Sequence, residues 1–311
     1  MGFFKNVVEP AAIALAFTAG TIINRRRTKL HAAQTTHTTV RDIETLPEVL
    51  SWICATFPFL KEVWYWLLTY WIYQLSRAFS ARIIAPHPQI YLLAKQHALQ
   101  LLSIEHALGI DIEQSLQAYI LTRHPGLMPV LRQIYQSHII VGVVFIVYTY
   151  TVLPTPLFRR IRRTIAMDNL IAFVIVSLWR CYPPRMLPPE FGFVDILHAS
   201  KPASVWTDNR FRLTIAAMPS LHFGTSLFFA VCLARFSPHV LVRVLAPLWP
   251  LAMFVTVVAT ANHFVLDLVA GAVVPLLGWR WNRALLVLEG VQDWVFAPVV
   301  ERMDPKTGVW K

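Results

Sequence analysis

The chain has 311 residues, of which 56% are hydrophobic and only 14% charged, and its formal net charge is +11. Soluble domains carry about 25% charged residues, so this composition excludes an ordinary water-soluble enzyme and predicts an integral membrane protein. The basic runs 25–27 and 159–163 lie beside apolar segments, which favours lipid headgroups over nucleic acid as their partners. The cysteines have no CxxC spacing and predict neither a disulfide framework nor a zinc site.

The N-terminal segment 6–24 is mostly apolar and precedes an arginine run. A secretory signal has its positive charges before the apolar core, so we expect a retained helix that lies at the interface or inserts weakly. The expected organisation is an N-terminal interfacial helix and linker over 1–57, a six-helix membrane catalytic domain over 58–283, and a cytoplasmic tail over 284–311.

Six apolar runs approach the length of about 20 residues that crosses a bilayer. The expected crossings are 58–78, 138–154, 166–183, 218–236, 241–260 and 262–280. Segment 89–124 has apolar residues at helical spacing among scattered polar ones, which predicts amphipathic helices lying on the membrane. The predicted fold class is all-α, a polytopic six-transmembrane-helix bundle with amphipathic interfacial helices.

The orientation follows from the basic residues of the short loops, because Lys and Arg accumulate on the cytoplasmic side. The run 159–163, Arg235 and Arg280 then share that side. The loop 184–217 and the turn 260–262 face the opposite side. We therefore expect an active site on the non-cytoplasmic face. As a separate expectation, the membrane is an endomembrane, in the endoplasmic reticulum or Golgi.

Residues 218–222, MPSLH, open the fourth expected crossing after a loop. Proline suits a first helical turn, and the free N–H groups and the helix dipole there favour a bound phosphate. His222 would stand one turn inside the helix and face that phosphate. The simpler interpretation is a histidine satisfied at a membrane interface.

Residues 262–267, NHFVLD, open the sixth expected crossing. His263 and Asp267 have the i, i+4 spacing of one helix face, so the carboxylate can accept the imidazole N–H and fix its tautomer. A structural pair is the alternative, but ionisable groups within membrane segments are functional by default.

Residues 182–185, YPPR, end the third expected crossing, and Arg185 offers a fork of donors suited to phosphate oxygens. A snorkelling anchor is the alternative. His138, and His198 with Asp195, lie on the expected active side and could bind a headgroup, but are interpreted as interfacial polar residues with local partners. Glu105, Asp111 and Glu113 suggest paired carboxylates, although a solvated or helix-packing role is favoured on an amphipathic helix.

Taken in order, PPR at 183–185, PSLH at 219–222 and NHFVLD at 262–267 resemble the motifs of the type 2 phosphatidic acid phosphatase superfamily. Those motifs are Lys/Arg-Pro, Pro-Ser-x-His, and an Arg followed by His-x-x-x-Asp, on a six-helix core. The closer resemblance is to the branch of inositol phosphorylceramide synthases, which are inositolphosphotransferases. It covers roughly 60–283, and the pair PSLH and HxxxD is its specific part.

The resemblance implies a role for each matching residue. His263 would be the nucleophile that forms a phosphohistidine, and Asp267 would orient it. His222 would protonate the leaving oxygen and then activate the acceptor. Helix N-terminal amides and three polar side chains would hold the phosphate: Arg185, Ser220 and Asn262. This scheme needs no metal or cofactor, and the expected partners are a lipid phosphate or diphosphate and membrane lipids.

Two departures concern the phosphate clamp. Leu178 and Val257 stand where the superfamily usually has a Lys and an Arg, and the inositol phosphorylceramide synthase branch departs there too. Other basic residues would then serve in their place: Arg180, Lys201, Arg210 or Arg212.

The predicted function is phosphoryl transfer from a lipid phosphate or diphosphate. Water as acceptor would make the chain a lipid phosphatase and an alcohol would make it a headgroup phosphotransferase; both use the same first half-reaction. One alternative is a prenyl-diphosphate phosphatase or terpene-cyclase-like enzyme, whose carbocation the aromatic side chains would stabilise. Another is a lipid-binding membrane protein without catalytic activity.

Overall fold

The computed structural model describes residues 19, 73–197, 215–287 and 290. Within these residues the chain is helical, with one isolated β-bridge and no strand, which confirms the all-α class. Apart from residue 19, the N-terminal segment 6–24 lies outside them, as does most of the expected crossing 58–78. The expected domain boundaries stay predictions.

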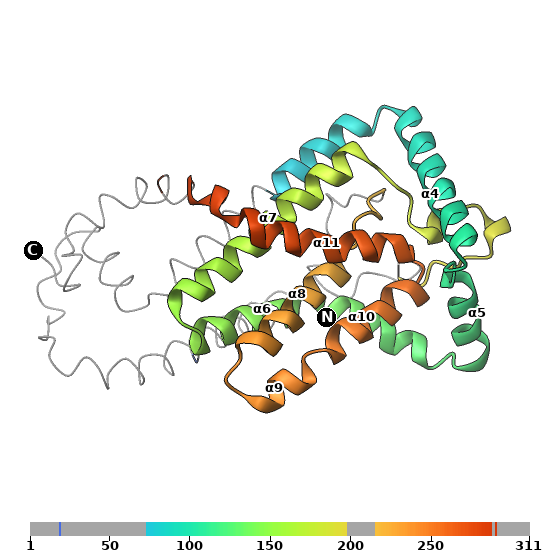
Figure 1. Ribbon diagram of the computed structural model, residues 1–311. Helices are drawn as coiled ribbons and strands as arrows, with labels where there is room; N and C mark the ends of the chain where they lie inside the picture. Colours follow the sequence, from blue (N-terminus) through green and yellow to red (C-terminus); the bar gives the residue numbers. More distant parts are fainter. Residues whose placement is uncertain (1–18, 20–72, 198–214, 288–289, 291–311) are drawn as a thin grey trace, which may run out of the picture.

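Eight labelled α-helices carry the described part of the chain (Figure 1). They are α4 (Pro88–Leu108), α5 (Glu113–Arg123), α6 (Leu127–Val152), α7 (Thr155–Leu178), α8 (Leu221–Phe236), α9 (Val240–Leu245), α10 (Leu248–Ala259) and α11 (Val265–Trp281). Short 3-10 turns are η3 (Pro184–Met186), η4 (Pro189–Phe191) and η5 (Asn282–Leu286). A further helical stretch covers 73–84.

Two helical stretches of the described residues are long and apolar enough to cross a membrane. They are α6 and the stretch Val240–Ala259 that α9 and α10 form together, while α8 is apolar but shorter. Large apolar side chains point outward from α6, α8, α10 and α11, among them Ile140, Val144, Val231, Leu251 and Leu276. An apolar surface of this kind fits association with a membrane. The count of six crossings stays a prediction.

The arginine run 159–163 lies inside a helix, so its expected place in a loop is wrong. α7 begins at Thr155, directly after Pro154, and ends at Leu178, several residues before the expected end at 183. Proline fixes a backbone angle that suits a helix start, and long arginine side chains can extend from a helix towards headgroups. The helix therefore begins at the proline rather than where the charges end.

α11 runs through the centre of the described part, against α7 and α8 (Figure 1). Its glycines allow the close approach, because a Cβ at Gly271 would overlap the backbone of Ser220 at the start of α8. A Cβ at Gly224 of α8 would in turn overlap the carbonyl oxygen of Gly271. The same contact holds the start of α8 beside the first turns of α11, where the Ser220 N–H donates to the Asp267 carbonyl at 2.9 Å.

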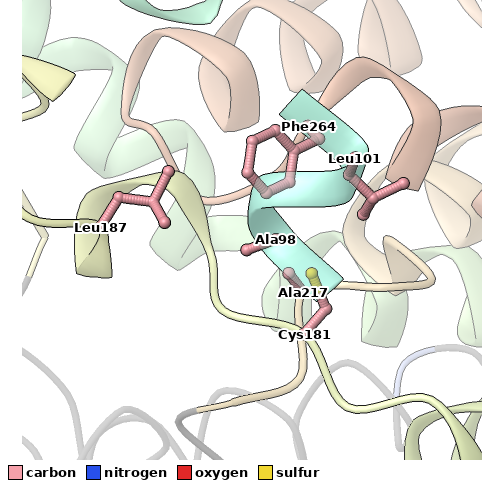
Figure 2. Packing of buried hydrophobic residues seen from close by; sticks show 6 residues of the cluster. All are labelled: Ala98, Leu101, Cys181, Leu187, Ala217 and Phe264. Atoms are coloured by element: carbon pink, nitrogen blue, oxygen red, sulfur yellow. The ribbon is translucent and has the colours of Figure 1, made fainter. Parts of the chain in front are cut away.

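An apolar cluster underlies the turn before α11 (Figure 2). It gathers residues from four parts of the chain: Ala98, Leu101, Cys181, Leu187, Ala217 and Phe264. Extended backbone segments connect it, since the Ala217 N–H donates to the Cys181 carbonyl at 3.1 Å. The Arg185 N–H likewise donates to the Ala261 carbonyl at 3.0 Å. The segments after α7, before α8 and before α11 are thereby fixed to one another.

Candidate active site

His263 lies in the turn before α11, two residues ahead of the helix start at Val265. The expectation that His263 and Asp267 share a helix face is therefore wrong. The turn is tight: Ala261 has a φ of 51°, and the Asn262 N–H returns to the Val257 carbonyl at 3.0 Å. Because this turn replaces a first helical turn, the ring of His263 is free to face the start of α8.

A backbone carbonyl sets the tautomer of His263. Its Nδ1 lies 2.7 Å from the Ala217 carbonyl oxygen, and a carbonyl can only accept, so Nδ1 carries the hydrogen. The lone pair of the neutral ring is then on Nε2. The carboxylate of Asp267 is farther away, with Oδ2 at 3.7 Å from Nδ1. Asp267 therefore acts on the ring mainly through its charge.

The fully buried Asp267 caps its own helix. Its Oδ2 accepts the N–H of Phe264 at 2.9 Å, which is one of the orphan donors at the start of α11. The next two amides also donate to carboxyl groups, Val265 to Glu113 and Leu266 to Glu105. The amides at this helix end are thus occupied by acids.

α8 begins at Leu221, with Ser220 as its N-cap. Pro219 therefore precedes the helix, and His222 is its second residue rather than one turn inside, which corrects the two expectations about this motif. Ser220 is fully buried, and its hydroxyl accepts the N–H of Phe223 at 3.4 Å. Its side chain thus shapes the helix start.

The rings of His222 and His263 lie side by side, with centroids 6.2 Å apart. Tyr135 of α6 stacks on His222 at 4.2 Å and 23°. His138, one turn further along α6, has its ring centroid 5.0 Å from that of His222. The sequence motifs thus meet, and α6 contributes neighbours that the motifs do not contain.

Asn262 holds Arg185 beside the histidine turn. Its Oδ1 accepts from Nη1 of Arg185 at 2.7 Å, and its Nδ2 donates to Oγ1 of Thr260 at 2.6 Å. On its other side, Nε of Arg185 lies 3.6 Å from a carboxylate oxygen of Asp195. Asn262 thus uses both ends of its amide within the protein, which favours a role in placing Arg185 over direct contact with phosphate.

Apolar residues stand at the two positions where the superfamily usually has a basic residue. Leu178 is 81% exposed, whereas Val257 is fully buried. Of the suggested replacements, Arg180 donates from Nη2 to Oγ of Ser80 at 2.8 Å. Arg77, from the stretch 73–84, is close enough for its charge to act on His222, which no sequence motif indicated. The other suggested replacements, which are Lys201, Arg210 and Arg212, lie outside the described residues. His198 also lies outside them.

The family model of the PAP2 superfamily matches residues 99–281. The match starts in α4, ends at the last residue of α11, and so includes all the motifs of the site. No curated protein and no solved structure matches the chain. Membership of this superfamily supports a phosphatase-type phosphoryl transfer on a phosphate-containing substrate. The chain belongs to the PAP2 superfamily.

Proposed function

We propose that the chain is a membrane enzyme that transfers a phosphoryl group from a lipid phosphate through a phosphohistidine at His263. The observation that carries the proposal is the pairing of His222 and His263, from separate elements, at 6.2 Å between ring centroids. In phosphoryl transfer the attacking and leaving atoms stand roughly in line on opposite sides of phosphorus. Two imidazoles brought together from separate elements suit the nucleophile and the general acid of such a reaction.

In the first half-reaction the Nε2 lone pair of His263 attacks phosphorus, and the bond from phosphorus to the lipid oxygen breaks. Protonated His222 gives its proton to that oxygen, so the lipid leaves as an alcohol. Positive charge grows on the ring of His263, and the carboxylate of Asp267, 3.7 Å from Nδ1, stabilises it.

In the second half-reaction neutral His222 takes the proton of the acceptor hydroxyl. The acceptor oxygen attacks phosphorus, and the bond to Nε2 breaks, which restores both histidines. With water the product is inorganic phosphate. With a ceramide hydroxyl as acceptor and phosphatidylinositol as donor, the group transferred is phosphoinositol, as the resemblance to inositol phosphorylceramide synthases implies.

The phosphate oxygens would be held between Arg185 and the N-terminus of α8. The Phe223 amide of α8 donates to the Ser220 hydroxyl, whereas the amides of Leu221 and His222 precede any carbonyl partner within the helix, and the helix dipole favours an anion there. The corresponding amides of α11 already donate to carboxyl groups. The start of α8 is therefore the helix end that suits the phosphate.

The test is turnover of a panel of lipid phosphates and diphosphates, and of phosphatidylinositol with and without ceramide, by purified protein in vesicles. We compare the wild type with His222→Ala, His263→Ala and a control, His106→Ala, whose side chain is exposed. Activity should fall at least about 100-fold in both active-site variants and persist in the control. Undiminished turnover by His263→Ala would refute the mechanism.

The covalent intermediate and the products decide the finer points. A donor labelled at phosphorus should leave an acid-labile label on the wild-type protein and none on His263→Ala. Phosphate release identifies a phosphatase, and inositol phosphorylceramide identifies the phosphotransferase branch. A terpene released from a prenyl diphosphate would support the cyclase alternative. Lipid binding that both alanine variants retain, without turnover by any form, would support the non-catalytic one.

A further inference from the structure

Two glutamates of the amphipathic segment reach across to the first turn of α11. Oε1 of Glu105 accepts the N–H of Leu266 at 2.6 Å, and Oε1 of Glu113 accepts that of Val265 at 2.8 Å. They come from α4 and α5, some 150–160 residues earlier in the chain. Both are essentially fully buried, so the interpretation of solvated acids is wrong and the helix-packing one is confirmed.

These bonds complete the cap of α11. The Phe264 N–H donates to the side chain of Asp267, and the Asp267 N–H returns to the Phe264 carbonyl at 3.1 Å. All four amides from Phe264 to Asp267 therefore have partners, three of which are carboxyl oxygens. Carboxyl groups at a helix N-terminus also interact favourably with its dipole. The turn that carries His263 is attached directly to this first turn.

The two glutamates act on each other's pKa, so their carboxyl groups lie close together. Burial raises the pKa of Glu105 to about 9, and the charge of Glu113 adds to the shift, so Glu105 is protonated at neutral pH. The charge of Asp267 on α11 also raises the pKa of Glu105. Cys181 is a further titratable neighbour, close enough for Asp267 and Glu105 to act on its pKa. Asp111 acts on Glu113 from the loop between α4 and α5.

The acids do not form a metal centre. Among the described residues no group of three or more His, Cys, Asp or Glu side chains is arranged to hold a metal ion. The second oxygens, Oε2 of Glu105 and of Glu113, have no N–H or hydroxyl partner there. Protonation of Glu105 avoids placing two negative charges side by side in this buried arrangement.

We propose that Glu105 and Glu113 act as one positioning unit, which clamps the first turn of α11 and so places His263 against Ala217 and opposite His222. The proposal rests on the function proposed above for His263. It assigns α4 and α5 a role beyond lying on the membrane, because they tie the position of the nucleophile to the interfacial helices. Loss of the proton would put two negative charges side by side next to Asp267 and loosen the turn.

The direction of the pH dependence follows from the raised pKa. The folded protein holds a proton on Glu105 that the unfolded chain releases near its ordinary pKa of 4.5. The stability from the protonated pair is complete below that pH and is lost progressively as the pH rises towards about 9. Glu105→Gln keeps an acceptor for Leu266 and a donor for Glu113, and it cannot ionise.

The experiment measures the melting temperature and kcat from pH 6 to pH 10 in Glu105→Gln, Glu105→Leu and the wild type. Glu190→Gln in η4 is the control, since it removes an exposed carboxylate outside the cap of α11. In the wild type and the control, the melting temperature should fall as the pH rises, and kcat should decrease at least tenfold near pH 9. Glu105→Gln should flatten both losses, and Glu105→Leu should lower kcat at every pH.

The ¹⁵N resonances of His263 give a readout that does not depend on turnover. Alkaline pH should disturb its Nδ1–H signature in the wild type and not in Glu105→Gln. Equal pH profiles of melting temperature and of the His263 resonances in these two proteins would overturn the proposal. If no form turns over a lipid phosphate, the proposed function fails, while the melting and resonance comparisons still decide whether the pair positions the ring.

Discussion

The contact between Gly271 and the start of α8 gives a direct test of how the two histidines are held together. In Gly271→Ala the new Cβ would overlap the carbonyl of Ser220, two residues before His222. That neighbour is backbone and cannot rotate away, so α8 and α11 must separate. Overpacking of this kind costs about 1–3 kcal/mol. The hydrogen bond from the Ser220 N–H to the Asp267 carbonyl, worth about 1 kcal/mol, would weaken as well.

The effect on catalysis should exceed the effect on folding. A misplacement of about 1 Å in a reacting pair can reduce the rate about 100-fold. We therefore expect Gly271→Ala to remain largely folded but to lose kcat by about this factor, with KM little changed. Melting temperature and initial rates on a lipid phosphate measure the two effects separately.

Gly142→Ala on α6 is the matched control. Its Cβ would lie 3.7 Å from ring carbons of Phe229, which is ordinary van der Waals contact. Alanine also favours a helix over glycine by about 1 kcal/mol, so this variant should be at least as stable as the wild type and fully active. Wild-type kcat in Gly271→Ala, or an equal loss in both variants, would refute the argument from close packing.

Two further substitutions test the neighbours of the histidines. In Asp267→Asn the side-chain oxygen can still accept the Phe264 N–H, so the melting temperature should stay close to that of the wild type. The value of kcat should fall about tenfold or more, because the negative charge near His263 is lost. A wild-type kcat would show that this charge plays no part in catalysis. Tyr135→Leu removes the ring stacked on His222, a contact worth about 0.5–1.5 kcal/mol. It should lower kcat in initial-rate assays and Tyr135→Phe should not; an equal loss in Tyr135→Phe would assign the effect to the hydroxyl group.

The helices could be predicted from hydropathy, but their ends could not. The fourth and fifth crossings expected at 218–236 and 241–260 correspond closely to α8 and to the stretch Val240–Ala259. α6 begins 11 residues before the expected start at 138, because its first turns carry polar residues that a hydropathy scan rejects. Helix ends depend on prolines, caps and tertiary contacts, and the apolar content of a segment reports none of these.

The motif residues could be predicted, whereas their partners could not. Two short patterns identified His222 and His263, which the fold brings together. The group that bonds Nδ1 of His263 is the carbonyl of Ala217, and any residue at that position could supply it. Glu105 and Glu113 carried a signal as two acids in an apolar setting, but their partners are backbone amides far along the chain. Such contacts arise only from the tertiary fold.

The two helix N-termini of the site differ in their free donors, and this difference favours one side for a bound phosphate. The carboxyl groups of Glu105, Glu113 and Asp267 accept the first amides of α11, which leaves none of these donors for a phosphate. The start of α8 is capped by a neutral hydroxyl, and the positive charge of Arg77 acts on His222. A phosphate should therefore approach His263 from the α8 side, where its Nε2 lone pair lies opposite the Nδ1–H that the Ala217 carbonyl holds.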